Sequence, residues 1–204
     1  MLVRVSVAET RYDGLRERAA SPATGRLGFL WGFAEATLFF IVPDVLLGAV
    51  ALFSARSAAR VLALTLAGAL VGGAVTYLIA SELPPARSAA IVDAVPTVRQ
   101  NAVRRVESEM RADGPRSVVY GPVRMGTPYK LYARAAGLQE QSLGALLLWS
   151  IPGRLERMLP VTLLAALAGL LGRRWIAAKP RATLGLYAAG WFAVYAVYVI
   201  RVGI

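Results

Sequence analysis

Two carboxylates lie within the first long apolar stretch of this chain, on either side of a proline. Glu35 precedes Pro43 by about two helical turns, and Asp44 follows it directly. An ionised side chain at bilayer depth costs roughly 2.5–3.5 kcal/mol, and burial and like charge both favour the protonated carboxyl. Two carboxylates at one depth can therefore share a proton. A structural alternative is that Asp44 caps the helix that follows the proline.

Basic residues lie in a second apolar stretch that prolines interrupt, and in the apolar helix after it. Arg124 and Lys130 flank Pro128, and Arg154 and Arg157 lie three residues apart, on one face of a helix. Guanidinium groups bind phosphate through paired hydrogen bonds. The opposite charges predict either a cavity that binds an anionic headgroup and resets by protonation, or buried ion pairs that only hold the fold.

The elements that must position these residues are apolar segments of membrane length. Ranges 61–81 and 182–200 carry no charged side chain, and about 20 apolar residues span a bilayer. Of the 204 residues 57% are hydrophobic, and the mean hydropathy is +0.55, whereas soluble domains are about 45–50% apolar. We therefore expect an all-α, polytopic membrane protein.

Proline breaks predict two re-entrant hairpins that face each other. Pro43 lacks an N–H and disfavours helix at the residue before it, so the segment near 27–55 is expected to enter and leave on one side. A single kinked span is the alternative. The segment 117–138, with its tip at Pro128, is the second hairpin, and Arg134 near its end is expected at the membrane interface. Broken segments in corresponding halves indicate a transporter's binding site.

The remaining elements complete a small bundle. We expect about three spanning helices, over residues 61–80, 142–171 and 182–204. Apolar residues at helical spacing between Thr97 and Met110 predict one amphipathic helix, at the membrane surface or packed on the bundle. Residues 1–26 are expected to form a cytoplasmic tail, and 27–181 one membrane domain.

The first plain spanning segment contains a pair of glycines four residues apart. Gly68 and Gly72 form a GxxxG motif, which allows another backbone to approach closely. The pair can equally reflect a chain rich in glycine and alanine, so the sequence leaves both interpretations open.

The composition excludes several classes of chemistry. The chain contains neither cysteine nor histidine, which removes disulfides, thiolate nucleophiles and histidine general bases. We predict no metal site, no cofactor and no enzymatic activity. Any proton coupling must use carboxylates or water.

The net charge of +11 is distributed at the ends of apolar runs, which is the positive-inside pattern rather than a nucleic-acid interface. Residues 1–26, 54–60 and 173–181 hold 5, 2 and 4 basic residues, against 6 in 82–116. If the first apolar segment is a hairpin, residues 1–26, 54–60 and 173–181 lie on the same side of the membrane. Their larger number of basic residues predicts that this side is cytoplasmic in a bacterial-type inner membrane. The expected partners are membrane lipids and protons, and a homo-oligomer is left open.

The first broken segment resembles that of the DedA family, also called the SNARE-associated or VTT-domain superfamily. Its hallmark is an early re-entrant segment with Glu, then Pro with an acidic residue, here Glu35, Pro43 and Asp44. This chain departs from the usual pattern by a single proline at the tip and by Asp instead of the commoner Glu.

The second broken segment resembles the same family. Its hallmark is a Gly/Pro-containing segment with two basic residues that ends in Ala-Gly, here Arg124, Pro128 and Lys130 before Ala136 and Gly137. The PYKLYARAAG stretch is similar to a DedA-like subgroup with the pattern P-[YF]-K-x-[FY]-x-x-x-[AS]-G and a downstream R-x-x-R. Lysine in place of the second arginine cannot form a bidentate fork.

The resemblance covers residues 25–172 and implies a membrane protein that moves or scrambles lipids. Bacterial members are linked to recycling of undecaprenyl phosphate and to membrane homeostasis, with proton coupling suspected. Carried over to this chain, it implies two protonatable carboxylates (Glu35 and Asp44), phosphate-binding cations (Arg124, Lys130, Arg154 and Arg157) and hairpin tips at Pro43 and Pro128. The alternatives are a non-transporting assembly or homeostasis protein and a lipid-phosphate enzyme.

Overall fold

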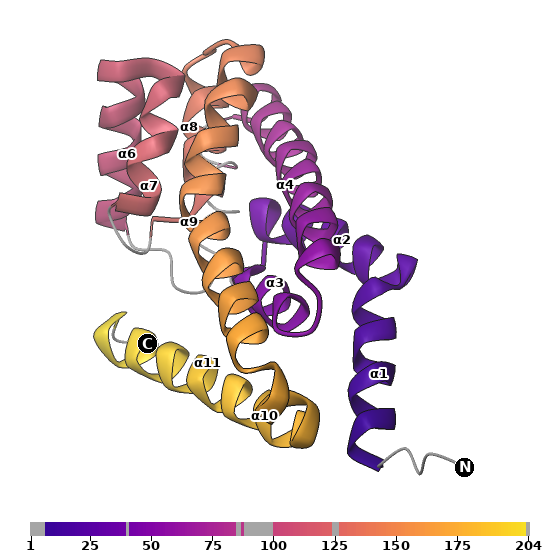
Figure 1. The fold of residues 1–204 in the computed structure, drawn as a ribbon. Coiled ribbons are helices and arrows are strands. Elements are labelled where there is room, and N and C mark those ends of the chain that lie inside the picture. The colour runs from indigo at the N-terminus through magenta and orange to yellow at the C-terminus, as the bar shows by residue number, and fades with distance from the viewer. Residues whose placement is uncertain (1–6, 40, 85–86, 88–99, 124–126, 203–204) are drawn as a thin grey trace, which may run out of the picture.

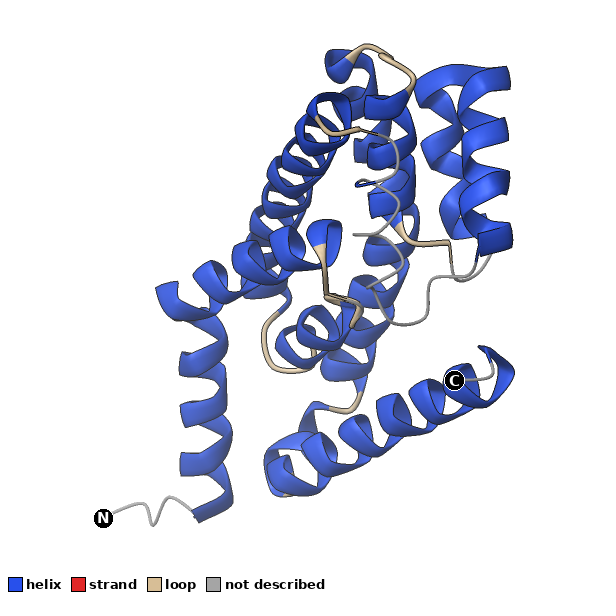
Figure 2. Ribbon diagram, turned by 180° about the vertical axis from the view of Figure 1, so that it is seen from behind, coloured by secondary structure: helices blue, strands red, loops and turns tan. Residues whose placement is uncertain are grey.

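The computed structural model describes residues 7–39, 41–84, 87, 100–123 and 127–202 (Figure 1). Every regular element in these ranges is a helix, as Figure 2 shows, and the all-α prediction is confirmed. The elements are α1 Val7–Ala20, α2 Pro22–Thr37, α3 Asp44–Ala51, α4 Ala55–Glu82, α6 Gln100–Asp113, η1 Gly114–Val119, α7 Tyr120–Val123, α8 Tyr129–Leu138, α9 Leu143–Leu171, α10 Arg173–Ala178 and α11 Pro180–Val202.

Two helices in the described part of the chain, α4 and α11, are long and apolar enough to cross a membrane. The 28 residues of α4 extend over about 42 Å, against about 30 Å for the hydrocarbon core of a bilayer. Only 28% of the apolar window of α4 and 6% of that of α11 is buried. A core helix of a soluble protein is mostly buried, so this exposure favours contact with lipid.

Helices α2 and α4 pack side by side and run in the same direction. A Cβ on Gly28, early in α2, would lie 2.8 Å from a methyl group of Val61, early in α4. Further along both helices, Thr76 Oγ1 donates a hydrogen bond to the carbonyl oxygen of Ala36 at 2.9 Å. Because positions on the two helices increase together, the chain between them must turn back before α4 begins.

Glycines on both helices allow this close approach. A Cβ on Gly68 would overlap the carbonyl oxygen of Phe29, and one on Gly32 would overlap that of Thr65. Gly72 likewise faces the backbone of α2. The GxxxG pair is therefore a packing surface and not a by-product of composition, and Gly32 is its counterpart on α2, which sequence analysis did not single out.

The return segment contains α3, which runs beside α9. Asp44 at the start of α3 faces Arg157, and Leu52 just after its end lies against Gly169 further along α9. The break in the first apolar segment, predicted from Pro43, is confirmed: α2 ends at Thr37 and α3 begins directly after the proline.

Helix α8 lies along the second half of α4. The Tyr129 ring lies against Gly73, and Gly137 lies against the carbonyl oxygen of Tyr77, so α8 also runs parallel to α4. The start of α8, at Tyr129, and the end of α2, near Ala36, therefore both lie beside residues 73–76, in the last third of α4. The second predicted break, at Pro128, is confirmed as the position where helix resumes.

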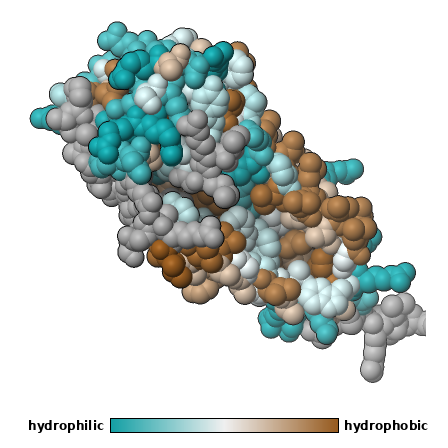
Figure 3. All heavy atoms as spheres, turned by 90° about the vertical axis from the view of Figure 1, so that its left-hand side faces the viewer, coloured by the Kyte–Doolittle hydropathy of each residue, from teal (hydrophilic) through white to brown (hydrophobic). Residues whose placement is uncertain are grey.

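The amphipathic helix α6 covers one end of the bundle. Its residues Val103, Val106 and Met110 are buried in a cluster shared with α8 and η1, which confirms the predicted apolar face and favours packing on the protein over a free surface helix. Residues 97–99 of the predicted helix lie outside the described residues. Hydrophilic side chains gather at this end of the molecule, and apolar side chains gather below it (Figure 3).

The described basic segments 7–26, 54–60 and 173–181 gather at the opposite end. Arg60 donates hydrogen bonds to the carbonyl oxygens of Ala20 and Ser21, at 2.8 and 2.9 Å, and α1 contacts α10. The predicted tail thus contains a helix, and α2 begins at Pro22, earlier than the predicted boundary.

Candidate functional site

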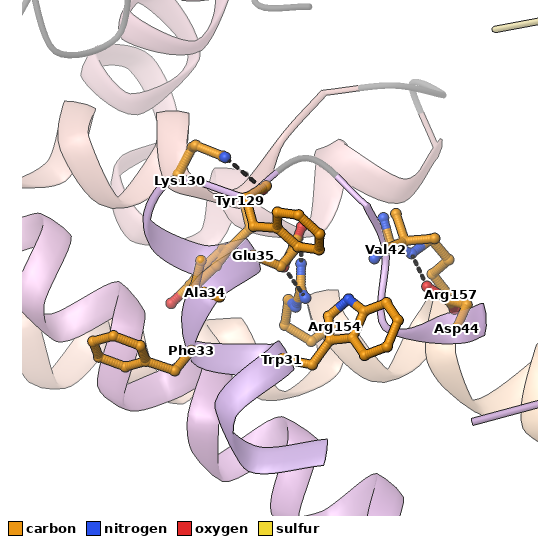
Figure 4. A network of polar contacts seen from close by, with 12 residues as sticks. Trp31, Phe33, Ala34, Glu35, Val42, Asp44, Tyr129, Lys130, Arg154 and Arg157 are labelled. Carbon is orange, nitrogen blue, oxygen red and sulfur yellow. Dashed lines mark hydrogen bonds and ion pairs between the residues drawn. The ribbon is translucent and has the colours of Figure 1, made fainter. Parts of the chain in front are cut away.

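Helix α9 positions the two arginines of the site. Ser142 caps its start by accepting a hydrogen bond from Ala145 N–H at 3.3 Å, and the helix then continues for 29 residues. Arg154 and Arg157 project from one face toward the first broken segment, as their spacing predicts (Figure 4).

Arg154 forms a two-pronged ion pair with Glu35. Its Nη1 donates to Oε1 at 3.3 Å, and its Nη2 donates to Oε2. Glu35 is 4% exposed and Arg154 5%. The guanidinium also lies 5.2 Å from the ring centroid of Tyr129, a cation–π distance. Good geometry and several partners are what a buried pair needs to offset its desolvation cost.

Arg157 forms a second, less complete pair with Asp44. Its Nε lies 3.2 Å from Oδ2, and Asp44 is 1% exposed whereas the Arg157 side chain is 37% exposed. Within the described ranges neither carboxylate oxygen accepts a hydrogen bond, and Arg157 Nη2 has no acceptor. A buried carboxylate without hydrogen bonds is costly, so this pair is the weaker of the two.

The capping interpretation of Asp44 is wrong. Pro43 occupies the N-cap position of α3, Asp44 is the first helical residue, and its oxygens accept none of the described backbone N–H groups. Its charge still lies in the first turn, where the helix dipole favours an anion.

Lys130 connects the two broken segments. The side chain is buried, with 4% exposed, and its Nζ donates to the carbonyl oxygen of Phe39 at 2.8 Å. The structure therefore places this cation at the junction of the two breaks, on a backbone acceptor. Arg124, the other cation predicted for this segment, lies outside the described residues.

We predict that Lys130→Met destabilises the protein by about 1.5–3 kcal/mol, because it removes a charged hydrogen bond between the segments. Thermal unfolding of both proteins in the same detergent would measure the difference. Arg104→Gln is the matched control, since Arg104 is exposed on α6 and its replacement should leave the unfolding temperature unchanged. Equal unfolding temperatures for all three proteins would contradict the role of Lys130.

Tyrosines of α11 contact the first break, which sequence analysis did not predict. Tyr187 donates to the carbonyl oxygen of Asp44 at 3.2 Å, and Tyr195 accepts a hydrogen bond from Val42 N–H at 2.8 Å. Trp191 lies between the two rings, with centroid distances of 6.4 and 6.1 Å. The signal in the sequence was the spacing of four residues, which aligns all three rings on one helix face.

A second set of buried polar contacts joins α6 to α8. Arg134 is 6% exposed and pairs with Glu107 at 2.7 Å, while Tyr132 donates to Glu109 at 2.9 Å. Arg134 is therefore covered by α6, and its position at the membrane interface stays a prediction. The carboxylates of α6 flank its apolar stripe, and the pattern of a single helix does not show that another helix covers them.

Comparisons with protein-family models, with curated proteins and with solved structures found no significant match to this chain. The resemblance to the DedA family therefore rests on the sequence motifs. Among the residues that the structure describes, no group of three or more acidic side chains is arranged to hold a metal ion.

Proposed function

We propose that this protein is a DedA-like membrane transporter that moves a lipid with an anionic phosphate headgroup. The observation that carries the proposal is the pairing of two buried carboxylates at the first break with two arginines on one face of α9 (Figure 4). Charged side chains inside a membrane protein mark substrate or proton pathways. Here they gather where two broken segments meet.

The direction of the helices supports a re-entrant first segment. If α2 and α3 together formed one kinked span, α4 would cross back and run antiparallel to α2. The contacts of Gly28 with Val61 and of Ala36 with Thr76 instead make the two helices parallel. In the proposed topology α2 enters the membrane, the chain returns through α3, and α4 crosses.

The second hairpin consists of η1 and α7 on one arm and α8 on the other. Gly121 of α7 lies against the Tyr132 ring of α8, because a Cβ on this glycine would lie 3.1 Å from a ring carbon. The two arms therefore run close together at this point. Helix α9 is the third proposed span, in which Arg154 and Arg157 face the paired carboxylates and Glu156 is exposed. The end that gathers the three basic segments is proposed to be cytoplasmic in a bacterial-type inner membrane.

The Glu35–Arg154 pair is buried on both sides, whereas Arg157 of the other pair is partly exposed. This difference suggests how protonation could drive transport. Protonation of Asp44 removes the charge that holds Arg157, and this arginine, whose side chain is 37% exposed, then binds a phosphate. Deprotonation restores the pair and releases the phosphate. The Glu35–Arg154 pair stays intact in this scheme and holds the two segments together.

We predict that Asp44→Asn abolishes lipid movement driven by a pH gradient. The measurement uses purified protein in liposomes with a fluorescent lipid-phosphate analogue, and the loss follows because the amide cannot carry the proton. Glu156→Gln is the matched control, because it removes the same charge from an exposed position of α9 and should leave the rate unchanged. Movement that needs no gradient and survives in the Asp44 variant would indicate a scramblase instead.

A second candidate is a membrane protein that transports nothing and uses its charges only to hold the fold. The completeness of the Glu35–Arg154 pair favours it, because both partners are buried and joined by two hydrogen bonds. Absence of movement for every lipid tested in the same liposomes would favour this candidate over the transporter.

A further inference from the structure

We propose that an outer groove between α2 and α4 binds one anionic phospholipid, at a site separate from the ion pairs and independent of the transport function. The groove has a volume of about 450 Å³, within the range of ligand sites, and lies between the N-terminal halves of the two helices. Its lining includes apolar residues and two arginines: Gly25, Phe29, Leu30, Leu64, Arg26 and Arg60.

The floor and walls of the groove suit an acyl chain. Gly25 has no side chain, and a Cβ there would lie 2.8 Å from Leu64 Cδ1. The two helices therefore approach closely at Gly25, and the groove lies above this contact. Leu30 is 60% exposed and Leu64 37%. Since α4 is long and apolar enough to span a membrane, the groove faces lipid and not a protein core.

The charged end of the groove suits a phosphate. Arg60 is oriented by its two hydrogen bonds to the carbonyl oxygens of Ala20 and Ser21, both made by Nη2, and a guanidinium has five N–H donors in all. Arg26 lines the same groove, and the positive end of the α2 dipole lies beside it. Basic pockets between membrane helices bind anionic headgroups.

Apolar walls and two arginines line the same groove, so the site fits a lipid with a charged headgroup better than a free phosphate. An inorganic phosphate would leave the apolar walls unused, and a zwitterionic headgroup would offset the favourable charge with its own cation. The charged end of the groove is also separate from the ion pairs, because Arg26 precedes Glu35 by nine residues, or about 13.5 Å along α2. Loss of this site therefore leaves the Glu35–Arg154 pair in place.

The test is lipid binding to the purified full chain in detergent, measured by native mass spectrometry with titrated lipid. We expect one dioleoylphosphatidylglycerol to bind at least tenfold more tightly than dioleoylphosphatidylcholine. We expect Arg26→Gln to weaken phosphatidylglycerol binding about tenfold, the loss of one charged hydrogen bond. Leu30→Ser should weaken the binding of both lipids, because it removes an apolar wall.

Arg56→Gln is the matched control, since Arg56 is an exposed residue of the first turn of α4 that does not line the groove. Equal binding of the two lipids would overturn the proposal, as would equal weakening by Arg56→Gln, which would indicate attraction by net charge alone. Inorganic phosphate that displaces phosphatidylglycerol at equal concentration would also overturn it. None of these outcomes depends on transport by the protein.

Discussion

Replacing Arg154 by glutamine is expected to destabilise the protein by about 3–5 kcal/mol, because Glu35 then stays buried without its counter-charge. Glu35 is 4% exposed and takes both of its strong hydrogen bonds from this arginine. Unfolding in mixed detergent micelles, followed by tryptophan fluorescence, would measure the loss. Arg157→Gln should cost less, since that side chain is 37% exposed. Equal losses in both variants would contradict the proposed ranking of the two pairs.

The double variant Glu35→Gln with Arg154→Gln isolates the interaction between the two groups. A neutral amide pair leaves no buried charge, so we expect the double variant to be more stable than Arg154→Gln alone. A charge swap of the other pair, Asp44→Arg with Arg157→Asp, separates the two proposed functions. A structural pair regains full function when swapped, whereas a proton-coupled carrier stays inactive because the carboxylate is displaced from its path.

The second large effect is expected from Gly68→Ala on α4, because the new methyl group would overlap the carbonyl oxygen of Phe29. Helix α2 must then move away from α4, at a cost of about 1–3 kcal/mol or more. The displacement also carries Glu35 away from Arg154, so we expect lipid movement to fall with stability. Unfolding temperature and transport rate, measured on one preparation, would test both.

Gly185→Ala on α11 is the control for that substitution. A Cβ at Gly185 meets no atom within 4 Å, and alanine is favoured over glycine in a helix by up to about 1 kcal/mol. The same chemical change should therefore raise stability at residue 185 and lower it at residue 68. A Gly68→Ala protein as stable as the unsubstituted chain would disprove the tight contact between α2 and α4.

The two ion pairs are expected to have different roles, one in stability and one in transport, and these variants would distinguish them. Glu35 accepts two hydrogen bonds from Arg154, whose Nε has no described acceptor, so replacement of either residue is expected to change stability first. Asp44 has the poorer partner and no described hydrogen bond to its oxygens, so its replacement should change transport more than stability. In the proposed transporter Asp44 is therefore the carboxylate assigned to the proton.

Much of the local structure was predictable from the sequence, because its causes are local. Hydropathy predicted helices of membrane length, and Pro43 and Pro128 predicted the two breaks, since a proline lacks a backbone donor and restricts its neighbour. The spacing of Arg154 and Arg157 placed both on one helix face. Each of these inferences depends on residues within a few turns of one another.

Only the tertiary structure decided which charges meet, because each pair joins residues far apart in the chain. Glu35 and Arg154 are separated by 119 positions, and no local pattern states which arginine a carboxylate will face. The same limit applies to Lys130, which binds a carbonyl oxygen of the other broken segment, and to Arg134, which α6 covers. Helical periodicity shows which face of a helix is buried, whereas the partner on that face depends on the packing of the whole bundle.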